Sequence, residues 1–222
     1  MNIVFCQDKK IFIKRNKTTL SLRLSVNQKG KVTLSVPLFY PMKKAQTFLT
    51  EHMDWIDEQL SQKSKQLNFK NGDSLTILGK TLTISHSPTH KGGVQISDCF
   101  LLVGGQPEFL TRRIFDFIKK ETYTYIDKNA RIQADKLYLK INKITLKDTT
   151  SRWGSCSGKK NLNFSWRLGM APLYVLDYII AHEVSHLKEM NHGPNFWKTV
   201  SFLTDKRSEA EIWLRRNGKE LY

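Results

Sequence analysis

Three histidines and a glutamate near the end of the sequence have the residue types and spacing of a metal site. His182, Glu183 and His186 form an H-E-x-x-H pattern, and His192 follows six residues after His186. On a helix, residues four apart share a face, with Cβ atoms roughly 5–6 Å apart, so two imidazoles can bind one ion. Glu183 can then take a proton from a metal-bound water. The pattern predicts hydrolytic zinc chemistry.

The third histidine requires the chain to turn. On a continuous helix, His192 would lie roughly 9 Å further along the axis than His186 and about 120° around it, out of reach of the ion. Asn191 tolerates a left-handed backbone, and Gly193-Pro194 does not continue a helix. We therefore expect the helix to stop and His192 to close the site from a turn. Three protein ligands leave a fourth position for water, as in catalytic zinc sites.

Two alternatives to a metal site are a chance match and an amphipathic helix with two solvent-facing histidines. Three of the chain's six histidines fall within residues 182–192, however, and the flanking residues favour a helix followed by a turn. The metal site is therefore the preferred interpretation. His52, His86 and His90 lack a patterned partner and are not expected to bind metal.

The elements that must position this site belong to the second half of an α+β chain. Helical spacing follows Pro107, and two apolar alternations flank a glycine turn, which predicts an antiparallel hairpin. Pro172 suits the first turn of the metal helix. The expected elements are a helix over 107–137, strands over 141–150 and 162–168, the metal helix, and short helices over 195–203 and 208–217.

A sheet edge beside the metal is expected to hold an extended substrate. Several zinc peptidase families bind the substrate as an added strand, and the predicted hairpin directly precedes the metal helix. Arg152 and Trp153 in this segment are the candidate substrate-binding residues, with Arg152 binding an anionic group or a developing oxyanion. A structural pairing with an aspartate or a backbone carbonyl is the alternative for Arg152 and the preferred interpretation for Arg167.

The first half of the chain, residues 1–105, is predicted to be β-rich and to contain one helix. Apolar and polar residues alternate on both sides of a turn within 11–37, as in a hairpin or meander. Helical spacing follows over 42–65, and short extended segments occupy 71–103. Gly104-Gly105 ends the last of them, and we place the domain boundary there.

The formal net charge of +16 is concentrated toward the N-terminal end. Residues 1–70 hold 13 basic and 5 acidic side chains, whereas residues 148–222 hold 11 and 8. A basic surface attracts acidic partners, including nucleic acid and nucleotides. A role in solubility is the simpler explanation, so weak electrostatic binding of nucleic acid or nucleotides through this region is the alternative.

Composition is otherwise typical of a globular protein. No apolar run reaches about 18 residues, and the N-terminus lacks a secretory signal, so we expect a cytoplasmic protein without a membrane span. Cys6, Cys99 and Cys156 are odd in number and widely spaced, which argues against a disulfide framework or a cysteine-ligated zinc. Cys156 is expected to be a free thiol, with a regulatory or metal-adjacent role as the alternative.

Three blocks in this order resemble the YgjP-like family of metal-dependent hydrolases, within the zincin metallopeptidases: RWGSC at 152–156, NFSWRLGMAP at 163–172 and HEVSHLKEMNHGPNFW at 182–197. The resemblance covers nearly the whole chain and implies a zincin-like metallohydrolase domain over 106–222. It implies His182, His186 and His192 as Zn²⁺ ligands. Glu183 would then be the general base. The resemblance also implies kinship with SprT-type and WLM-type proteases, which act on proteins attached to DNA.

The spacing of the third histidine matches that of metzincins, but Glu189 stands where they carry a glycine and no Met-turn pattern follows. Members of the resembled family have been labelled both metallopeptidases and nucleotide (UTP) pyrophosphatases. We expect a zinc metallopeptidase that acts on a peptide or protein, with Glu183 activating a zinc-bound water. The alternatives are a metal-dependent UTP pyrophosphatase and a DNA-associated protease recruited through the basic N-terminal region.

Overall fold

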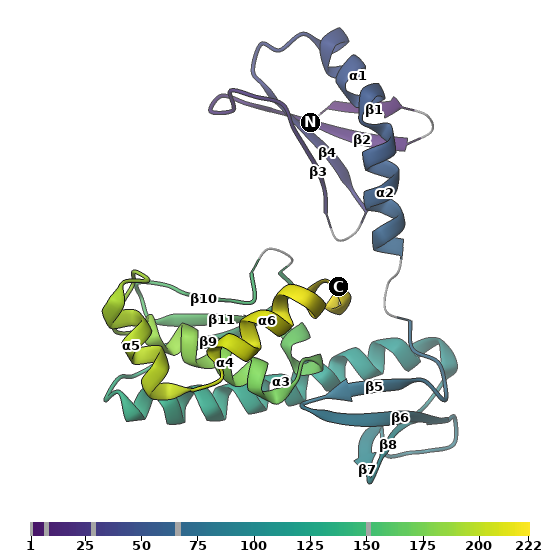
Figure 1. The fold of residues 1–222 in the computed structure, drawn as a ribbon. Coiled ribbons are helices and arrows are strands. Elements are labelled where there is room, and N and C mark those ends of the chain that lie inside the picture. The colour runs from purple at the N-terminus through teal and green to yellow at the C-terminus, as the bar shows by residue number, and fades with distance from the viewer. Residues whose placement is uncertain (1, 7–8, 28–29, 65–67, 150–151) are drawn as a thin grey trace. The chain divides into compact units, whose positions relative to one another are not determined.

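The computed structural model describes residues 2–6, 9–27, 30–64, 68–149 and 152–222 (Figure 1). The chain forms two compact units, Met1–Gln66 and Leu67–Tyr222. Strands dominate the start of the chain and helices its end, which confirms the predicted α+β class. Within the described residues, no helix combines the length and hydropathy needed to cross a membrane.

The first unit is a four-stranded sheet with two helices on one face. Its elements are β1 (Asn2–Cys6), β2 (Lys9–Asn16), β3 (Arg23–Val26), β4 (Val32–Pro37), α1 (Met42–Glu51) and α2 (Met53–Ser64). The order is β1-β2-β4-β3, with β2 and β4 parallel and the other pairs antiparallel. The hairpin expected within 11–37 is β3–β4. The single helix expected over 42–65 is two helices that meet at His52, and residue 65 lies outside the described residues.

Alternation along the strands builds the core of this unit. Ile11 and Ile13 of β2 and Leu34 of β4 point to the same face because successive strand residues alternate between faces. Ala45 and Leu49 of α1 cover them, as do residues of α2. The apolar faces of both helices therefore pack against the same face of the sheet and form one core with it.

The second unit begins with another four-stranded sheet and a long helix. Its first elements are β5 (Ser74–Ile77), β6 (Lys80–Ser87), β7 (Val94–Ser97), β8 (Phe100–Gly104), the 3-10 turn η1 (Pro107–Phe109) and α3 (Leu110–Lys136). The sheet order is β5-β6-β8-β7, with β6 and β8 parallel. The long helix predicted over 107–137 is thus present, with a 3-10 first turn.

The division between the units differs from the boundary that the sequence placed after residue 105. The reason is the packing of α3, which is shared by two cores. Its N-terminal half buries Ile114 and Ile118 against the β5–β8 sheet. Its C-terminal half buries Ile126 and Ala130 against the helix that carries the histidines. Segments 71–103 therefore belong with the second unit, and Gly104-Gly105 is a turn within it.

The rest of the second unit surrounds the histidine helix. Its elements are β9 (Lys143–Lys147), β10 (Gly154–Cys156), β11 (Asn161–Ser165), the 3-10 turn η2 (Trp166–Met170), α4 (Leu173–Ser185), α5 (Pro194–Leu203), α6 (Arg207–Asn217) and the 3-10 turn η3 (Gly218–Leu221). Trp166 and Leu168, expected on a strand, lie in η2. The two short helices expected after the histidines are α5 and α6.

The strand arrangement differs from the expected hairpin in one respect. An antiparallel hairpin is present, but it joins β10 to β11, and β9 pairs with β11 in parallel on the other side. Alternation alone could not distinguish these pairings, because a period of two is the same for either direction. The parallel register places Ile144 beside Leu162 and buries both in one core. As a result β10 is an edge strand of the three-stranded sheet.

Candidate metal centre

The helix α4 brings His182 and Glu183 into its last turn and ends at Ser185. Nine of its thirteen side chains are buried, which fixes the helix against α3 and α6. His186 follows directly, still in a helical backbone conformation, so that the four-residue spacing from His182 is preserved. The rotamers of the two histidines are therefore supported by a rigid, buried element, as a metal site requires.

The turn that leads to His192 does not use the left-handed Asn191 that we expected from the sequence. Amides of Leu187 and Lys188 donate to the carbonyls of Val184 and Ser185 at 3.0 and 3.1 Å, which tightens the chain directly after the helix. The described residues with positive φ do not include Asn191, so the expected left-handed residue is absent there. Pro194 begins α5, as the helix-breaking Gly193-Pro194 pair led us to expect.

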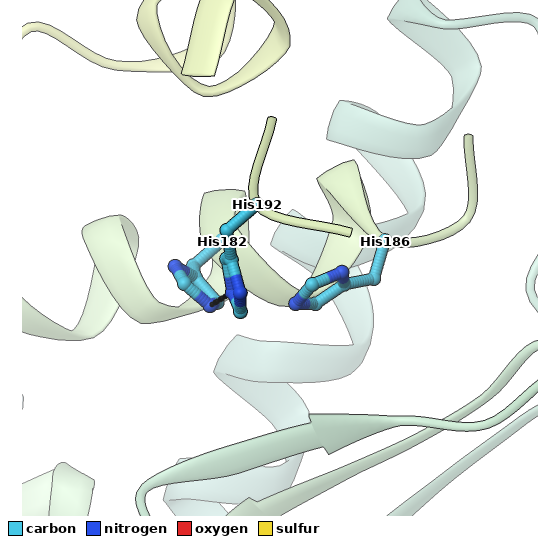
Figure 2. Close-up of side chains that lie close together, drawn as sticks. All are labelled: His182, His186 and His192. Carbon is cyan, nitrogen blue, oxygen red and sulfur yellow. Dashed lines mark hydrogen bonds between the residues drawn. The ribbon is translucent and has the colours of Figure 1, made fainter. Parts of the chain in front are cut away.

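The three histidines lie around one small space (Figure 2). Nε2 of His182 is 3.1 Å from Nε2 of His192, and one ring nitrogen of each histidine lies within 4.8 Å of those of the other two. Tetrahedral coordination with Zn–N distances of 2.0–2.1 Å requires nitrogens about 3.3 Å apart. The donor set and its separation therefore fit a divalent metal such as zinc. Among the described residues this is the one cluster of three or more such ligands.

The surroundings of His182 and His186 favour neutral imidazole rings. Nδ1 of His186 donates to the carbonyl of Glu189 at 3.0 Å, which leaves Nε2 as an acceptor. Burial, followed by the neighbouring His186 and His192, lowers the pKa of His182 to about 4. A neutral imidazole is the form that binds metal. The fully buried ring of Phe196 packs against all three histidines, at centroid distances of 4.5–5.0 Å.

Glu183 is the buried carboxyl group of the site. It is 5% exposed, and burial raises its pKa to about 8, an effect that the nearby Arg152 guanidinium partly offsets. Its Oε2 atom has no hydrogen-bond partner among the described residues. A carboxyl group held in this way can exchange a proton near neutral pH, and a cation bound beside it would favour the ionised form.

Gly154 explains why the carboxyl of Glu183 fits beside β10. A Cβ atom at this position would lie 2.5 Å from Oε1 of Glu183, far inside van der Waals contact. The glycine of the RWGSC segment therefore lets the backbone of an edge strand approach the carboxyl directly. No role was predicted for Gly154 from the sequence, although a glycine inside a strand signals a close backbone approach.

Arg152 and Trp153, the predicted substrate-binding residues, directly precede Gly154, whose backbone meets the Glu183 carboxyl. Both line a cavity of about 250 Å³ that also includes Gly154, Lys147 and Asn163. Arg152 is exposed, and its influence on the pKa of Glu183 places its charge near that carboxyl. Trp153 is half-buried, and its ring lies 5.4 Å from that of Tyr222. The cavity therefore connects the edge strand with two cations and an aromatic side chain.

A polar network behind the histidines was not found from the sequence. The hydroxyl of Tyr178 and Nε of Arg207 both donate to Oε1 of Glu211, at 2.7 and 2.9 Å. The Arg207 guanidinium lies 3.3 Å from the centre of the Trp197 ring, which stacks on His192. Helices α4, α5 and α6 are thereby tied together around the site. The only sequence signal was the four-residue spacing of Arg207 and Glu211 on one helix.

Three further residues have clear surroundings. Arg167 pairs with Asp148 at 2.9 Å and donates to the Leu221 carbonyl at 2.6 Å, so it is structural as preferred. Asp177 accepts a hydrogen bond from the Tyr125 hydroxyl at 2.9 Å and does not orient a histidine. Cys156 is a free thiol on β10, and burial, then the charge of Glu183, raises its pKa to about 11.

A sequence model of the YgjP-like metallopeptidase domain matches residues 20–217, most of the chain. The matched region contains the three histidines, Glu183 and the edge strand, and the match points to a metal-dependent hydrolase. No curated protein and no solved structure matches the chain.

Proposed function

Because the chain belongs to the YgjP-like metallopeptidase-domain family, we propose that it is a zinc-dependent peptidase in which Glu183 is the general base. His182, His186 and His192 hold the metal in this proposal. Three imidazoles favour zinc over Mg²⁺, which prefers oxygen ligands. Bound zinc would polarise the substrate carbonyl and lower the pKa of a water in the fourth position.

The residues of the chain carry out the proton transfers. Glu183 takes the proton that the attacking water loses and later delivers it to the leaving amine. Its burial keeps bulk water from competing for that proton. Arg152, whose charge is felt at the Glu183 carboxyl, binds the anionic group or the oxyanion that develops on the substrate.

The contact between β10 and Glu183 is the observation that favours a peptide substrate. Within the described residues, β10 is paired only on the side of β11, so its other side can bind an extended chain through backbone hydrogen bonds. Gly154 brings this edge against the carboxyl of Glu183. A peptide added to β10 would therefore pass the general base, with Trp153 available to a side chain.

A second candidate is hydrolysis of a nucleoside triphosphate such as UTP. Lys147 and Arg152 line the cavity beside β10, and no acidic side chain lines it among the described residues. Two cations in such a cavity can bind phosphates. The described residues contain no acidic cluster of the kind that holds Mg²⁺ beside phosphates, which makes this the weaker candidate.

Parallel assays separate the two candidates. Zinc-loaded protein and its Glu183→Gln variant are incubated with a library of fluorogenic peptides and with UTP, and bound zinc is measured in both. We expect peptide cleavage by the wild type only, with equal zinc content. Hydrolysis of UTP without peptide cleavage would replace the first candidate by the second. Cleavage by Glu183→Gln would show that another residue is the base.

A further inference from the structure

The sheet of the first unit has a second face that α1 and α2 do not cover. Residues of this open face alternate with the core residues of the strands and carry aromatic, aliphatic and basic side chains. Ile3 and Phe5 of β1 are 46% and 70% exposed. The open face includes Ile3, Phe5, Lys10, Phe12, Lys14 and Arg23, together with the hydroxyl side chains of Ser25, Thr33 and Ser35.

Strand register brings these side chains together. Phe5 lies opposite Lys10, and Ile3 lies opposite Phe12, so two aromatic rings lie on adjacent rungs of one face. Lys14 and Arg23 both pair with Ser35 of β4, one on each side of it. The rings are thus bordered by cations along the strands. The ammonium groups of Lys31 and Lys10 lie 3.8 and 5.6 Å from the centre of the Phe12 ring.

The charges of the first unit are divided between its two faces. All four acidic residues that the structure describes in this unit lie on α1 or α2: Glu51, Asp54, Asp57 and Glu58. Lys9, which points to the covered face, pairs with Asp57. Among the described residues, no ion pair joins Lys10, Lys14 or Arg23 to an acidic side chain. The open face is therefore a positively charged surface with two aromatic rings on its β1–β2 side.

We propose that the open face binds single-stranded nucleic acid. Unpaired bases stack on aromatic rings, here the exposed Phe5 and the half-buried Phe12, while phosphates bind the surrounding lysines and Arg23. A duplex hides the faces of its bases and could not use the rings. A second copy of the chain would bring two positively charged faces together. An acidic protein would use the cations but would leave the rings without a role.

The proposal concerns a surface of the first unit, whereas the three histidines belong to the second, and it does not depend on the substrate of the metal centre. The strands β1 and β2 supply most of the open face and precede residue 20, where the match to the family begins. Binding there would hold the chain on nucleic acid, whatever the metal centre cleaves.

Fluorescence anisotropy with the full chain tests the proposal. Labelled oligothymidine, oligouridine and a duplex of equal length are titrated at several salt concentrations, and the two single strands distinguish DNA from RNA. We expect the single strands to bind more tightly than the duplex. Phe5→Ala should weaken single-strand binding by about tenfold, and Phe5→Trp should retain it. Lys10→Gln with Lys14→Gln should lower the salt slope by about 1.4.

The matched control neutralises two lysines on α1, which lies on the other face of the sheet. Lys43 and Lys44 are exposed on α1, and Lys43→Gln with Lys44→Gln should leave most of the binding intact. Circular dichroism of each variant verifies that the unit is folded. Equal binding of duplex, an unchanged affinity of Phe5→Ala, or an equal loss in the α1 control would overturn the proposal. Displacement by polyglutamate as efficient as by unlabelled oligonucleotide would indicate an acidic protein partner instead.

Discussion

The sheets β1–β4 and β9–β11 meet solvent in opposite ways. The first presents a face, on which alternate side chains such as Phe5 and Lys10 are displayed. The second presents an edge, β10, whose backbone approaches the carboxyl of Glu183 at Gly154. A face binds through side chains, whereas an edge binds through the backbone. A carboxyl group can therefore reach the backbone of an edge strand only where that strand lacks a side chain. Binding on a face, in contrast, requires side chains.

The two regions also differ in whether their positive charges are paired with acidic side chains. Around the metal centre, Arg167 and Arg207 are paired with Asp148 and Glu211, so these cations hold the framework together. On the open face of the first unit, the cations border aromatic rings. The number of arginines and lysines in a sequence therefore does not show whether they form structural ion pairs or remain available to a ligand. The positions of the acidic residues in the fold decide this.

The largest effect is expected from Gly154→Ala, which adds a side chain to the edge strand. Its Cβ atom would overlap the Glu183 carboxyl and displace the proposed general base. We expect kcat/KM to fall by about 10²-fold or more, with zinc content unchanged. Peptide hydrolysis and bound zinc are measured on the same preparation.

Gly158→Ala is the matched control, because it lies in the β10–β11 turn and a Cβ atom there meets nothing within 4 Å. That variant should keep its activity. Binding of oligonucleotide by Gly154→Ala should equal that of the wild type, since the open face is untouched. Full activity of Gly154→Ala would contradict the close approach of edge and base.

His192→Ala should break the metal centre while leaving both sheets intact. Loss of one of three ligands is expected to weaken zinc binding by more than the roughly 10–100-fold that an outer-shell partner contributes. Competition with a chromophoric chelator measures the affinity, with Glu183→Gln as the variant that keeps the metal. Unchanged zinc affinity would rule out His192 as a ligand.

The grouping of His182, His186 and His192 was predictable because these residues are close in sequence and their spacing has a direct geometric meaning. The same sequence did not show that β9 pairs in parallel with β11, since alternation carries no strand direction. Nor did it show the network of Tyr178, Arg207 and Glu211, whose members come from different helices. The boundary after residue 105 was placed at a glycine pair, whereas the extent of each unit follows from the two cores that share α3.

Tyr178→Phe should produce a smaller, structural effect. It removes the hydroxyl that donates to Glu211 and leaves that carboxylate with Arg207 as its donor. We expect a loss of about 1 kcal/mol in the free energy of unfolding and a decrease of roughly 2–4 °C in Tm. Tyr174→Phe on the same helix is the control, because the Tyr174 hydroxyl has no hydrogen bond to any described residue. An equal decrease in Tm in both variants would show that the hydrogen bond from Tyr178 to Glu211 does not stabilise the packing of α4 on α6.

The smallest effect concerns the reactivity of Cys156, on the edge strand. Burial and the charge of Glu183 raise its pKa to about 11, so the thiol is protonated at pH 8 and only the thiolate is alkylated. Iodoacetamide should therefore modify the exposed Cys99 first. As long as the pH stays below the pKa of Cys156, its labelling rate should rise about tenfold for each unit by which the pH is increased. Mass spectrometry of peptides after timed labelling measures both rates. Labelling of Cys156 as fast as Cys99 at pH 8 would mean that β10 opens to solvent, and the edge would then not be the rigid element that positions a substrate against Glu183.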